Sequence, residues 1–185
     1  MQRFTCDKTL QFEFGAEWQN SVIEFDAADV IQKAQNSLPS TKAVDYLGIH
    51  RNKLYFIEVK DFRGEQRRIE QKNKYQTEDA LLNVIACKVR DSVACLVGTM
   101  QDSRISQIWS PYKQLICQPQ TTIKVIFWYE EDKQNRKRRT AGANFLSNQL
   151  KKKLKWLTTK VLVVDMQQSP AIDLIVSNVK REQLN

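Results

Sequence analysis

Two apolar runs with a short polar break between them dominate the hydrophobic pattern of this chain. The first covers residues 42–49, the second covers residues 54–62, and residues 50–53 separate them. Runs of this length that are bounded by polar positions are typical of neighbouring β-strands joined as a hairpin. The second run is apolar at both odd and even positions, so it predicts a strand that is covered on both faces, inside an α/β layer.

Further strands are expected where apolar residues alternate with polar ones or form short apolar runs. They cover residues 3–14, 21–25, 123–129 and 161–164. The tail from about Ile172 adds an edge strand or frays.

Helices are expected between these strands. A short helix has Asp26 as its N-cap, reaches about Asn36 and ends before Pro39. A longer helix runs from about Thr77 to Met100, and its spacing predicts a buried stripe. That stripe consists of Leu81, Ile85, Val89, Val93, Leu96 and Met100. A lysine-rich helix carries an apolar stripe of Leu146, Leu150, Leu154 and Leu157.

Strands that alternate with helices in this order predict an α/β fold with a mixed central sheet flanked by helices. The 185 residues fit one domain, residues 1–185, with room for a substantial core.

Charged residues interrupt the two central runs, among them Asp45 in the first, and Glu58 and Lys60 in the second. Glu58 and Lys60 point to the same side, because side chains alternate along a strand. Burying three charges is costly unless they pair with one another or hold an ion. The alternative is a surface ion pair worth under about 1 kcal/mol, which the apolar neighbours on both faces disfavour.

The length of the connecting loop decides whether Asp45 shares that face. A two-residue turn at 52–53 puts Asp45 opposite Lys60, with Glu58 diagonal. A four-residue loop over 50–53 puts Asp45 opposite Glu58, with Lys60 diagonal. A three-residue loop without a bulge turns Asp45 to the other face. Two carboxylates and a lysine on one face indicate a metal site for phosphodiester chemistry, provided that the loop has even length.

Asp45, twelve intervening residues and then Glu58-Val59-Lys60 resemble the core motif of the PD-(D/E)XK nuclease superfamily. Val44 stands at the proline position of the family name, which is variable in that superfamily. The resemblance covers about residues 20–100 by motif and by order of elements. It implies a restriction-endonuclease-like fold and hydrolysis of DNA.

The same resemblance assigns roles to the residues. Asp45 and Glu58 correspond to metal ligands, the carbonyl of Val59 joins them, and Lys60 corresponds to the catalytic lysine. The implied cofactor is Mg²⁺, with Mn²⁺ as a substitute, because hard divalent ions take oxygen ligands. Such an ion activates a water, and the lysine orients it or stabilises the developing oxyanion. Many members add an upstream acid, for which the candidates are Glu17, Glu24 and Asp26.

The net charge of +8 indicates a polyanionic partner, because neutralising phosphates releases counterions. We expect DNA, with RNA not excluded. Basic residues cluster in an expected loop of some fourteen residues after residue 62, in an expected loop near residue 136, and on the lysine-rich helix. The residues expected to bind nucleic acid are Arg63, Arg67, Arg68, Arg136, Lys137, Arg138, Arg139, Lys151 and Lys152. The alternative is that each cluster is solvated surface.

Several other polar residues are expected to be exposed. The acidic run 130–132 follows a strand and is typical of solvated acids rather than of a metal site. Lys88 and Arg90 flank the stripe of the long helix, where helix surface is favoured over contact with a phosphate. His50, the single histidine, lies in a turn and is expected to be solvent-exposed, which disfavours His-based nucleophilic or zinc chemistry.

The four cysteines form no CxxC pair and are expected to be small core residues rather than a disulfide frame or a zinc site. No apolar run approaches the ~20 residues of a membrane span, and no apolar leader is expected. A cytoplasmic protein is therefore predicted, without a membrane partner.

The sequence thus predicts a metal-dependent nuclease that acts on DNA. Its specificity is expected to come from DNA structure, from homodimerisation or from a protein partner. The alternatives are a non-catalytic nucleic-acid-binding module and an accessory interaction protein, each retaining the fold.

Overall fold

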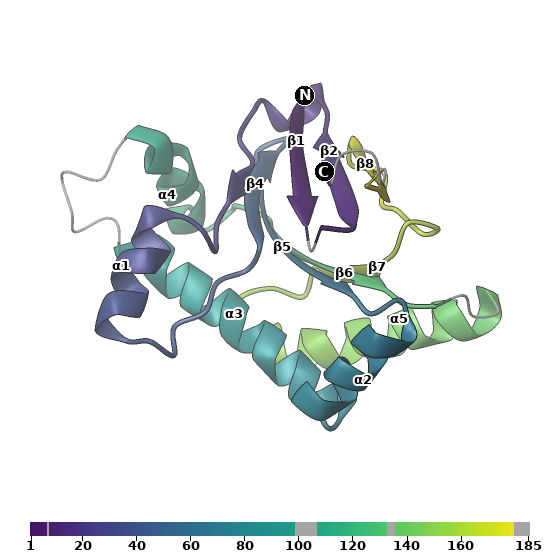
Figure 1. Ribbon diagram of the computed structural model, residues 1–185. Coiled ribbons are helices and arrows are strands. Elements are labelled where there is room, and N and C mark those ends of the chain that lie inside the picture. Colours follow the sequence, from purple (N-terminus) through teal and green to yellow (C-terminus); the bar gives the residue numbers. More distant parts are fainter. Residues whose placement is uncertain (7, 99–106, 133–135, 180–185) are drawn as a thin grey trace.

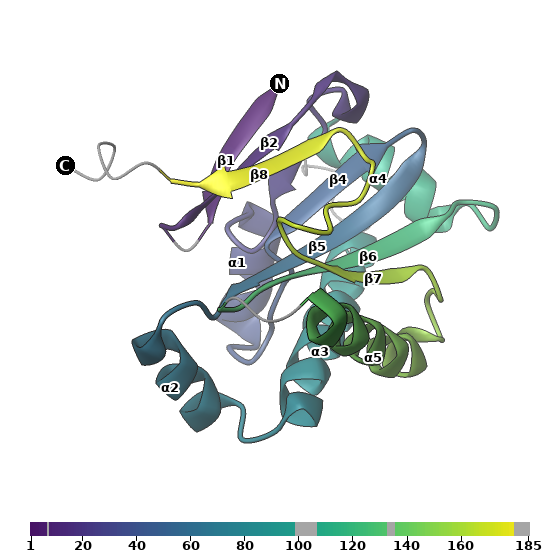
Figure 2. The same cartoon turned by 90° about the vertical axis from the view of Figure 1, so that its right-hand side faces the viewer.

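The computed structural model describes residues 1–6, 8–98, 107–132 and 136–179, which form three layers (Figures 1 and 2). A five-stranded mixed sheet lies in the middle, with strands in the order β3-β4-β5-β6-β7. A three-stranded antiparallel sheet, in the order β1-β2-β8, covers one of its faces, and helices cover the other. The predicted α/β class with a mixed central sheet is confirmed, but helices flank that sheet on one side only among the described residues.

The bounds of the elements are as follows. The strands are β1 (Gln2–Cys6), β2 (Leu10–Phe14), β3 (Ile23–Glu24), β4 (Tyr46–His50), β5 (Lys53–Asp61), β6 (Ile123–Glu130), β7 (Val161–Val164) and β8 (Leu174–Asn178). The α-helices are α1 (Asp29–Ser37), α2 (Glu65–Lys74), α3 (Glu78–Gly98), α4 (Ser110–Cys117) and α5 (Arg136–Leu154). Short 3-10 helices cover Ala16–Trp18 and Gln107–Trp109.

The central hairpin is closed by a tight turn at Arg51-Asn52. Both residues have positive φ, 48° and 57°, as a type I′ turn requires. Tyr46 pairs with Ile57 and His50 pairs with Lys53, so continuing the register by one position places Asp45 opposite Glu58. This is the pairing expected from the four-residue loop, although the strands extend further into that loop than expected.

Strand β5 is buried on both faces, as predicted. Leu54 and Phe56 face the helices, in one hydrophobic core. Tyr55, Ile57 and Val59 face the small antiparallel sheet, in a second core. Both neighbours of β5 are strands, β4 antiparallel and β6 parallel, so its backbone is also fully paired. Any charge on β5 is therefore held inside the protein.

The second core is unusually aromatic. Phe12 meets Tyr46 and Trp128, and Phe14 meets Tyr46 and Trp18, with ring centroids 5.0–6.0 Å apart. Such pairs contribute about 0.5–1.5 kcal/mol each beyond their buried area. They attach the N-terminal segment to the central sheet.

The helices confirm some expectations and correct others. In α3 the expected residues Leu81, Ile85, Val89 and Leu96 are buried and Val93 is partly buried, whereas Met100 lies outside the described residues. On α5, Leu146, Leu150 and Leu154 are buried as expected, and Leu157 packs against the core.

The N-cap expected at Asp26 is wrong, because α1 begins at Asp29 with Ala28 as its N-cap. The backbone N–H of Phe25 donates to the carbonyl of Asp45 at 2.8 Å, which prolongs the strand pairing. The N–H of Ala28 then donates to the carbonyl of Phe25 at 3.1 Å, so a turn precedes the helix.

Two expected loops are helical. Residues 65–74 form α2, and α5 begins at Arg136, inside the basic run that was expected to be a loop. Helix α2 is polar nearly throughout, and its one aliphatic side chain, Ile69, is 54 % exposed. It therefore lacks the apolar stripe by which helices are recognised. Within the described ranges, no helix combines the length and apolar content needed to cross a membrane.

We predict that Gly48→Ala lowers the free energy of unfolding by about 1–3 kcal/mol, through overpacking. A Cβ at this position in β4 would lie 2.9 Å from Cζ3 of Trp18 and 3.1 Å from Cγ2 of Val22. Trp18 cannot yield easily, because it is fully buried and its Nε1 donates to the carbonyl of Ile172 at 2.7 Å. Urea unfolding measures the change.

Gly142→Ala is the matched control. No atom lies within 4 Å of a Cβ at Gly142, which is in α5. The substitution should stabilise the protein by about 0.5–1 kcal/mol, because alanine favours a helix interior. Equal effects at both glycines would contradict the assignment of close packing to Gly48.

Candidate active site

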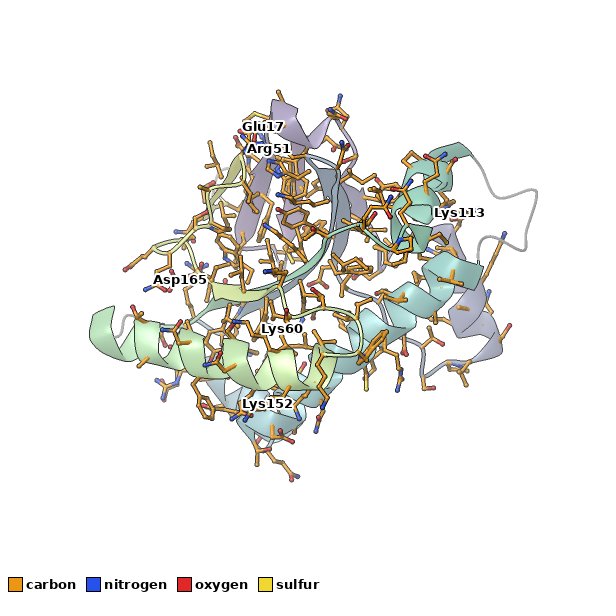
Figure 3. The ribbon with its side chains drawn as sticks, turned by 180° about the vertical axis from the view of Figure 1, so that it is seen from behind. Glu17, Arg51, Lys60, Lys113, Lys152 and Asp165 are labelled. Carbon is orange, nitrogen blue, oxygen red and sulfur yellow. The ribbon has the colours of Figure 1, made fainter. Side chains whose placement is uncertain are left out.

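Four charged side chains meet on the helix-facing side of the central hairpin. They are Asp45, just before β4, Glu58 and Lys60 on β5, and Lys88 on α3. Figure 3 shows Lys60 between the central sheet and the helix layer, well away from the turn that carries Arg51. The structure therefore brings together the three residues that the sequence predicts and adds a fourth.

Asp45 is fixed to both neighbouring strands. Its Oδ2 accepts a hydrogen bond from the backbone N–H of Val59 at 2.6 Å, and its carbonyl accepts from Phe25. The side chain is 14 % exposed. Its position is thus determined by backbone contacts on each side, while its Oδ1 remains directed toward Lys88 at 3.3 Å.

Glu58 is the most deeply buried acid of the site, with a side chain that is 0 % exposed. Burial raises the pKa of Glu58, and the nearby negative charge of Asp45 raises it further. Two ammonium groups oppose this effect. Lys60 Nζ lies 2.5 Å from Oε1, and Lys88 Nζ lies 2.8 Å from Oε1 and 2.9 Å from Oε2. The ammonium groups of Lys60 and Lys88 thus favour the ionised form of the Glu58 carboxyl.

Both lysines are themselves largely buried, with exposed fractions of 18 % for Lys60 and 16 % for Lys88. Burial alone would lower the pKa of each ammonium, but the negative charges of Glu58 and Asp45 outweigh it and raise both pKa values. The two lysines are therefore charged at neutral pH. Lys60 Nζ also donates to the carbonyl of Val59 at 2.8 Å.

The expectation that Lys88 is ordinary helix surface is wrong, whereas Arg90 behaves as expected. Arg90 is 62 % exposed and pairs with Asp91. Lys88 follows the buried Ile85 by three positions, which places both on one helix face. This spacing is the sequence signal for Lys88, but it does not reveal that the face looks toward Asp45.

Of the three candidates for an upstream acid, Asp26 fits the site best. Partial burial raises the pKa of Asp26, and the charge of Asp45 raises it further, while Lys88 opposes this. Asp26 therefore lies within electrostatic reach of the site. Glu24 is exposed on β3, where it pairs with Tyr46.

Glu17 lies elsewhere, at the hairpin turn. Its carboxylate contacts His50 Nε2 at 2.8 Å and also binds Arg51 (Figure 3). His50 was expected to be exposed, and this is wrong: it is 3 % exposed because Trp18 and Tyr55 stack around its ring. Glu17 thus stabilises the hairpin turn by binding His50 and Arg51, and it does not contribute to the site.

The oxygen donors of the site suit a hard divalent cation. Asp45 Oδ1, both oxygens of Glu58 and the Val59 carbonyl all lie within 3.3 Å of an ammonium nitrogen, so a positive charge is already accommodated among them. Carboxylates and carbonyls are the ligands that Mg²⁺ uses. No group of three His, Cys, Asp or Glu side chains close enough to hold a metal occurs in the described part of the chain. The ligands that fit a divalent metal here are therefore the carboxylates of Asp45 and Glu58 and the carbonyl of Val59.

A hollow of about 330 Å³ opens beside Lys60. It is lined by Lys60, Asp61, Phe62, Arg67, Glu70, Lys74 and Tyr75. Arg67, Glu70 and Lys74 belong to α2 and Tyr75 directly follows it, so the segment expected to be a substrate loop borders the site as a helix. Tyr75 is buried, and Lys74 Nζ lies 5.4 Å from its ring centre.

Two of the basic residues in this region are held by Asp61. Arg63 Nε donates to Oδ1 at 2.8 Å and a terminal nitrogen of Arg63 donates to Oδ2 at 2.7 Å. Arg67 lies 3.3 Å from Oδ2, and Thr9 Oγ1 donates to the same oxygen at 2.8 Å. Arg63 and Arg67 therefore belong to a structural ion-pair network, and Arg67 also borders the hollow.

The remaining candidates for nucleic-acid binding lie on helices. Arg68 is exposed on α2, Lys151 is half-buried and Lys152 is exposed on α5 (Figure 3). The side chains of Arg136, Lys137, Arg138 and Arg139 lie outside the part of the chain that the structure describes.

The acidic run after β6 is only partly solvated. Glu130 is buried, contrary to expectation, because its Oε1 accepts from Trp128 Nε1 at 2.9 Å and from the N–H of Met166 at 2.7 Å. Asp132 is exposed as expected. The cysteines also depart in part from the expected core role. None of the four forms a disulfide, but Cys117 is exposed and the others are half-buried.

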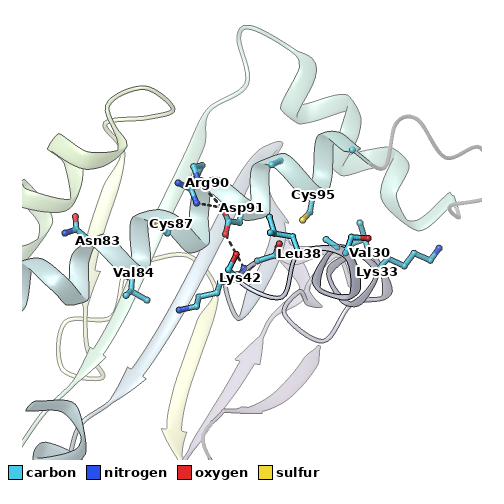
Figure 4. A pocket seen from close by; sticks show the side chains of 16 residues that line it. Val30, Lys33, Leu38, Lys42, Asn83, Val84, Cys87, Arg90, Asp91 and Cys95 are labelled. Atoms are coloured by element: carbon cyan, nitrogen blue, oxygen red, sulfur yellow. Dashed lines mark hydrogen bonds and ion pairs between the residues drawn. The ribbon is translucent and has the colours of Figure 1, made fainter. Parts of the chain in front are cut away.

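A larger groove, of about 830 Å³, lies between α1 and α3 (Figure 4). Its lining includes Val30, Leu38, Val84 and the two thiols of Cys87 and Cys95. None of the four charged residues of the site lines it. It is mainly apolar and lacks paired acids, so it offers no chemistry comparable to that beside Lys60.

No family model, curated protein or solved structure matches the chain.

We predict that Asp61→Asn lowers the free energy of unfolding by about 2 kcal/mol at pH 7, because two arginines lose a charged, buried acceptor. Burial raises the pKa of Asp61, but hydrogen bonds from Arg63 and Thr9 outweigh this and hold the pKa below its usual value. The stabilisation is therefore complete above the ordinary carboxyl pKa of roughly 4 and is lost as the pH falls through the lower folded value.

Denaturant unfolding of both proteins at pH 7 and at pH 3 measures this effect, and their difference should narrow in acid. Asp132→Asn is the control, because Asp132 is 51 % exposed and lies 4.0 Å from Arg68. It should change stability by under about 1 kcal/mol. If the two proteins differed in free energy of unfolding by the same amount at pH 7 and at pH 3, the Asp61 ion-pair network would not be the cause of the difference.

Proposed function

We propose that this protein is a metal-dependent nuclease of the PD-(D/E)XK type that hydrolyses phosphodiester bonds in DNA. The observation that carries the proposal is the meeting of Asp45 and Glu58 across the central hairpin, with Lys60 against Glu58 and the Val59 carbonyl. The order of the mixed sheet, with an antiparallel hairpin followed by parallel strands, supports a restriction-endonuclease-like fold.

Each residue of the site would have a separate role in the reaction. Asp45, Glu58 and the Val59 carbonyl would hold Mg²⁺, with Mn²⁺ as a substitute. When bound, the ion would lower the pKa of a coordinated water and neutralise charge on the attacked phosphate. Lys60 would orient the attacking water through its ammonium protons, because it is anchored at the Val59 carbonyl beside the reacting groups. The surrounding apolar core excludes competing water from Glu58.

The basic residues near the site would bind the nucleic acid. Lys74 and Arg67 border the hollow beside Lys60, and Arg68 stands exposed on the same helix. Positive charges next to a site attract a phosphate backbone without reading its sequence. Specificity would then come from DNA structure, from a homodimer or from a protein partner. Four cysteines without a disulfide suit a cytoplasmic location.

One observation favours a second candidate, a non-catalytic DNA-binding module with the same fold. Two ammonium groups already neutralise the acids of the site, and this arrangement is self-sufficient without a metal. Such a module would bind DNA equally well in the presence of a chelator. An accessory interaction protein would bind DNA weakly and only at low salt.

We predict that Asp45→Asn and Lys60→Met each lower the rate of DNA cleavage at least about 100-fold. Asp45→Asn removes a charged ligand of the metal, and Lys60→Met removes the ammonium that orients the attacking water. The assay uses supercoiled, linear and single-stranded DNA, and RNA, with Mg²⁺ or Mn²⁺. EDTA should abolish cleavage. The product pattern distinguishes endonuclease from exonuclease action.

Lys124→Met is the matched control, since it removes the same charge from the neighbouring strand β6. Lys124 lies opposite Tyr55, at the end of the pairing remote from Lys60. Cleavage by this variant should equal that of wild type. DNA binding without cleavage in every protein would favour the binding module, and absence of both would favour a protein partner.

A further inference from the structure

We propose that Lys88 is an internal counter-ion that occupies the cation position between Asp45 and Glu58, and that a divalent metal must displace it to bind. The proposal rests on the nuclease function proposed above and concerns the control of metal binding at that site. It assigns a role to a residue outside the Asp45, Glu58 and Lys60 motif.

The contacts of Lys88 differ from those of Lys60. Lys88 Nζ lies 3.3 Å from Asp45 Oδ1 and within 2.9 Å of both oxygens of Glu58, so it bridges the two acids. Lys60 reaches Glu58 and the Val59 carbonyl. A metal held by Asp45 and Glu58 would therefore compete with Lys88 for all three of its acid oxygens. It would compete with Lys60 only for Glu58 Oε1 among these oxygens.

The backbone around Lys88 is tied to the segment that carries Asp45. The N–H of Val44 donates to Ser92 Oγ at 3.0 Å, and the N–H of Lys42 donates to Asp91 Oδ2 at 3.2 Å. Ser92 is fully buried. Because α3 is fastened to residues 42–44 in this way, Lys88 starts from a fixed position opposite Asp45 and reaches the acids without movement of the helix.

The side chain can nevertheless leave while the helix stays. A lysine has a flexible four-carbon stem, and its charge needs a new partner when it withdraws. Asp26 lies within electrostatic reach of both Lys88 and Asp45.

The test measures Mn²⁺ binding by titration calorimetry and thermal unfolding in EDTA, with the full chain. Lys88→Met removes the competing charge, so it should bind Mn²⁺ on the order of tenfold more tightly than wild type. In EDTA it should unfold at a lower temperature, because Asp45 and Glu58 lose their bridge. Lys88→Gln, which keeps hydrogen-bond donors, should shift both quantities in the same directions and serves if the methionine variant does not fold.

Arg90→Met is the control, since it removes one positive charge two residues further along α3, at an exposed position. Its Mn²⁺ affinity should equal that of wild type. Tighter binding by the Lys88 variants supports the proposal, even if no protein cleaves DNA, in which case the nuclease function fails alone. Unchanged or weaker binding by these variants overturns it, and the nuclease function survives if wild type binds Mn²⁺ and cleaves. Absence of Mn²⁺ binding in every protein overturns both.

Discussion

A carboxylate buried in the middle of a paired strand is the constraint on which this structure depends. Glu58 lies on β5, whose backbone is paired on both sides and whose apolar side chains fill two cores. Water cannot solvate Glu58 there. Burying an isolated charge would cost more free energy than the whole net stability of a domain. Two cations offset its charge, Lys60 from the same strand and Lys88 from α3.

The arrangement explains why the site lies where it does. The turn at Arg51-Asn52 fixes the register of the hairpin, and the register fixes which residue opposes Glu58. Because side chains alternate along a strand, a slip of one residue would send Asp45 to the aromatic core on the other face. The acid pair is therefore determined by a turn at the opposite end of the hairpin.

Much of this could be predicted from the sequence, and the exceptions have physical causes. The central hairpin, the long helix and the face shared by Glu58 and Lys60 follow from periodicity, which is a local property. The face of Asp45 depends in addition on the length of the loop. Helix α2 lacks an apolar stripe, so no pattern marks it.

Tertiary contacts explain the other departures. The burial of Lys88 and His50 depends on contacts with residues far away in sequence, namely Asp45 and Trp18, so the local pattern does not predict it. The second sheet was missed because nothing local indicates that residues 174–178 pair with residues 10–14. The catalytic role and the metal remain predictions.

That second sheet has a consequence for how the protein is made. Strand β2 pairs with β1 on one side and with β8 on the other, so the layer unites residues that are more than 150 positions apart. Until residues 174–178 have left the ribosome, this layer lacks one edge over the aromatic face of β5 and β6. Contacts between distant parts of a chain form slowly, and open apolar faces are prone to aggregation. The aromatic face of the central sheet is therefore fully covered only after synthesis has passed β8.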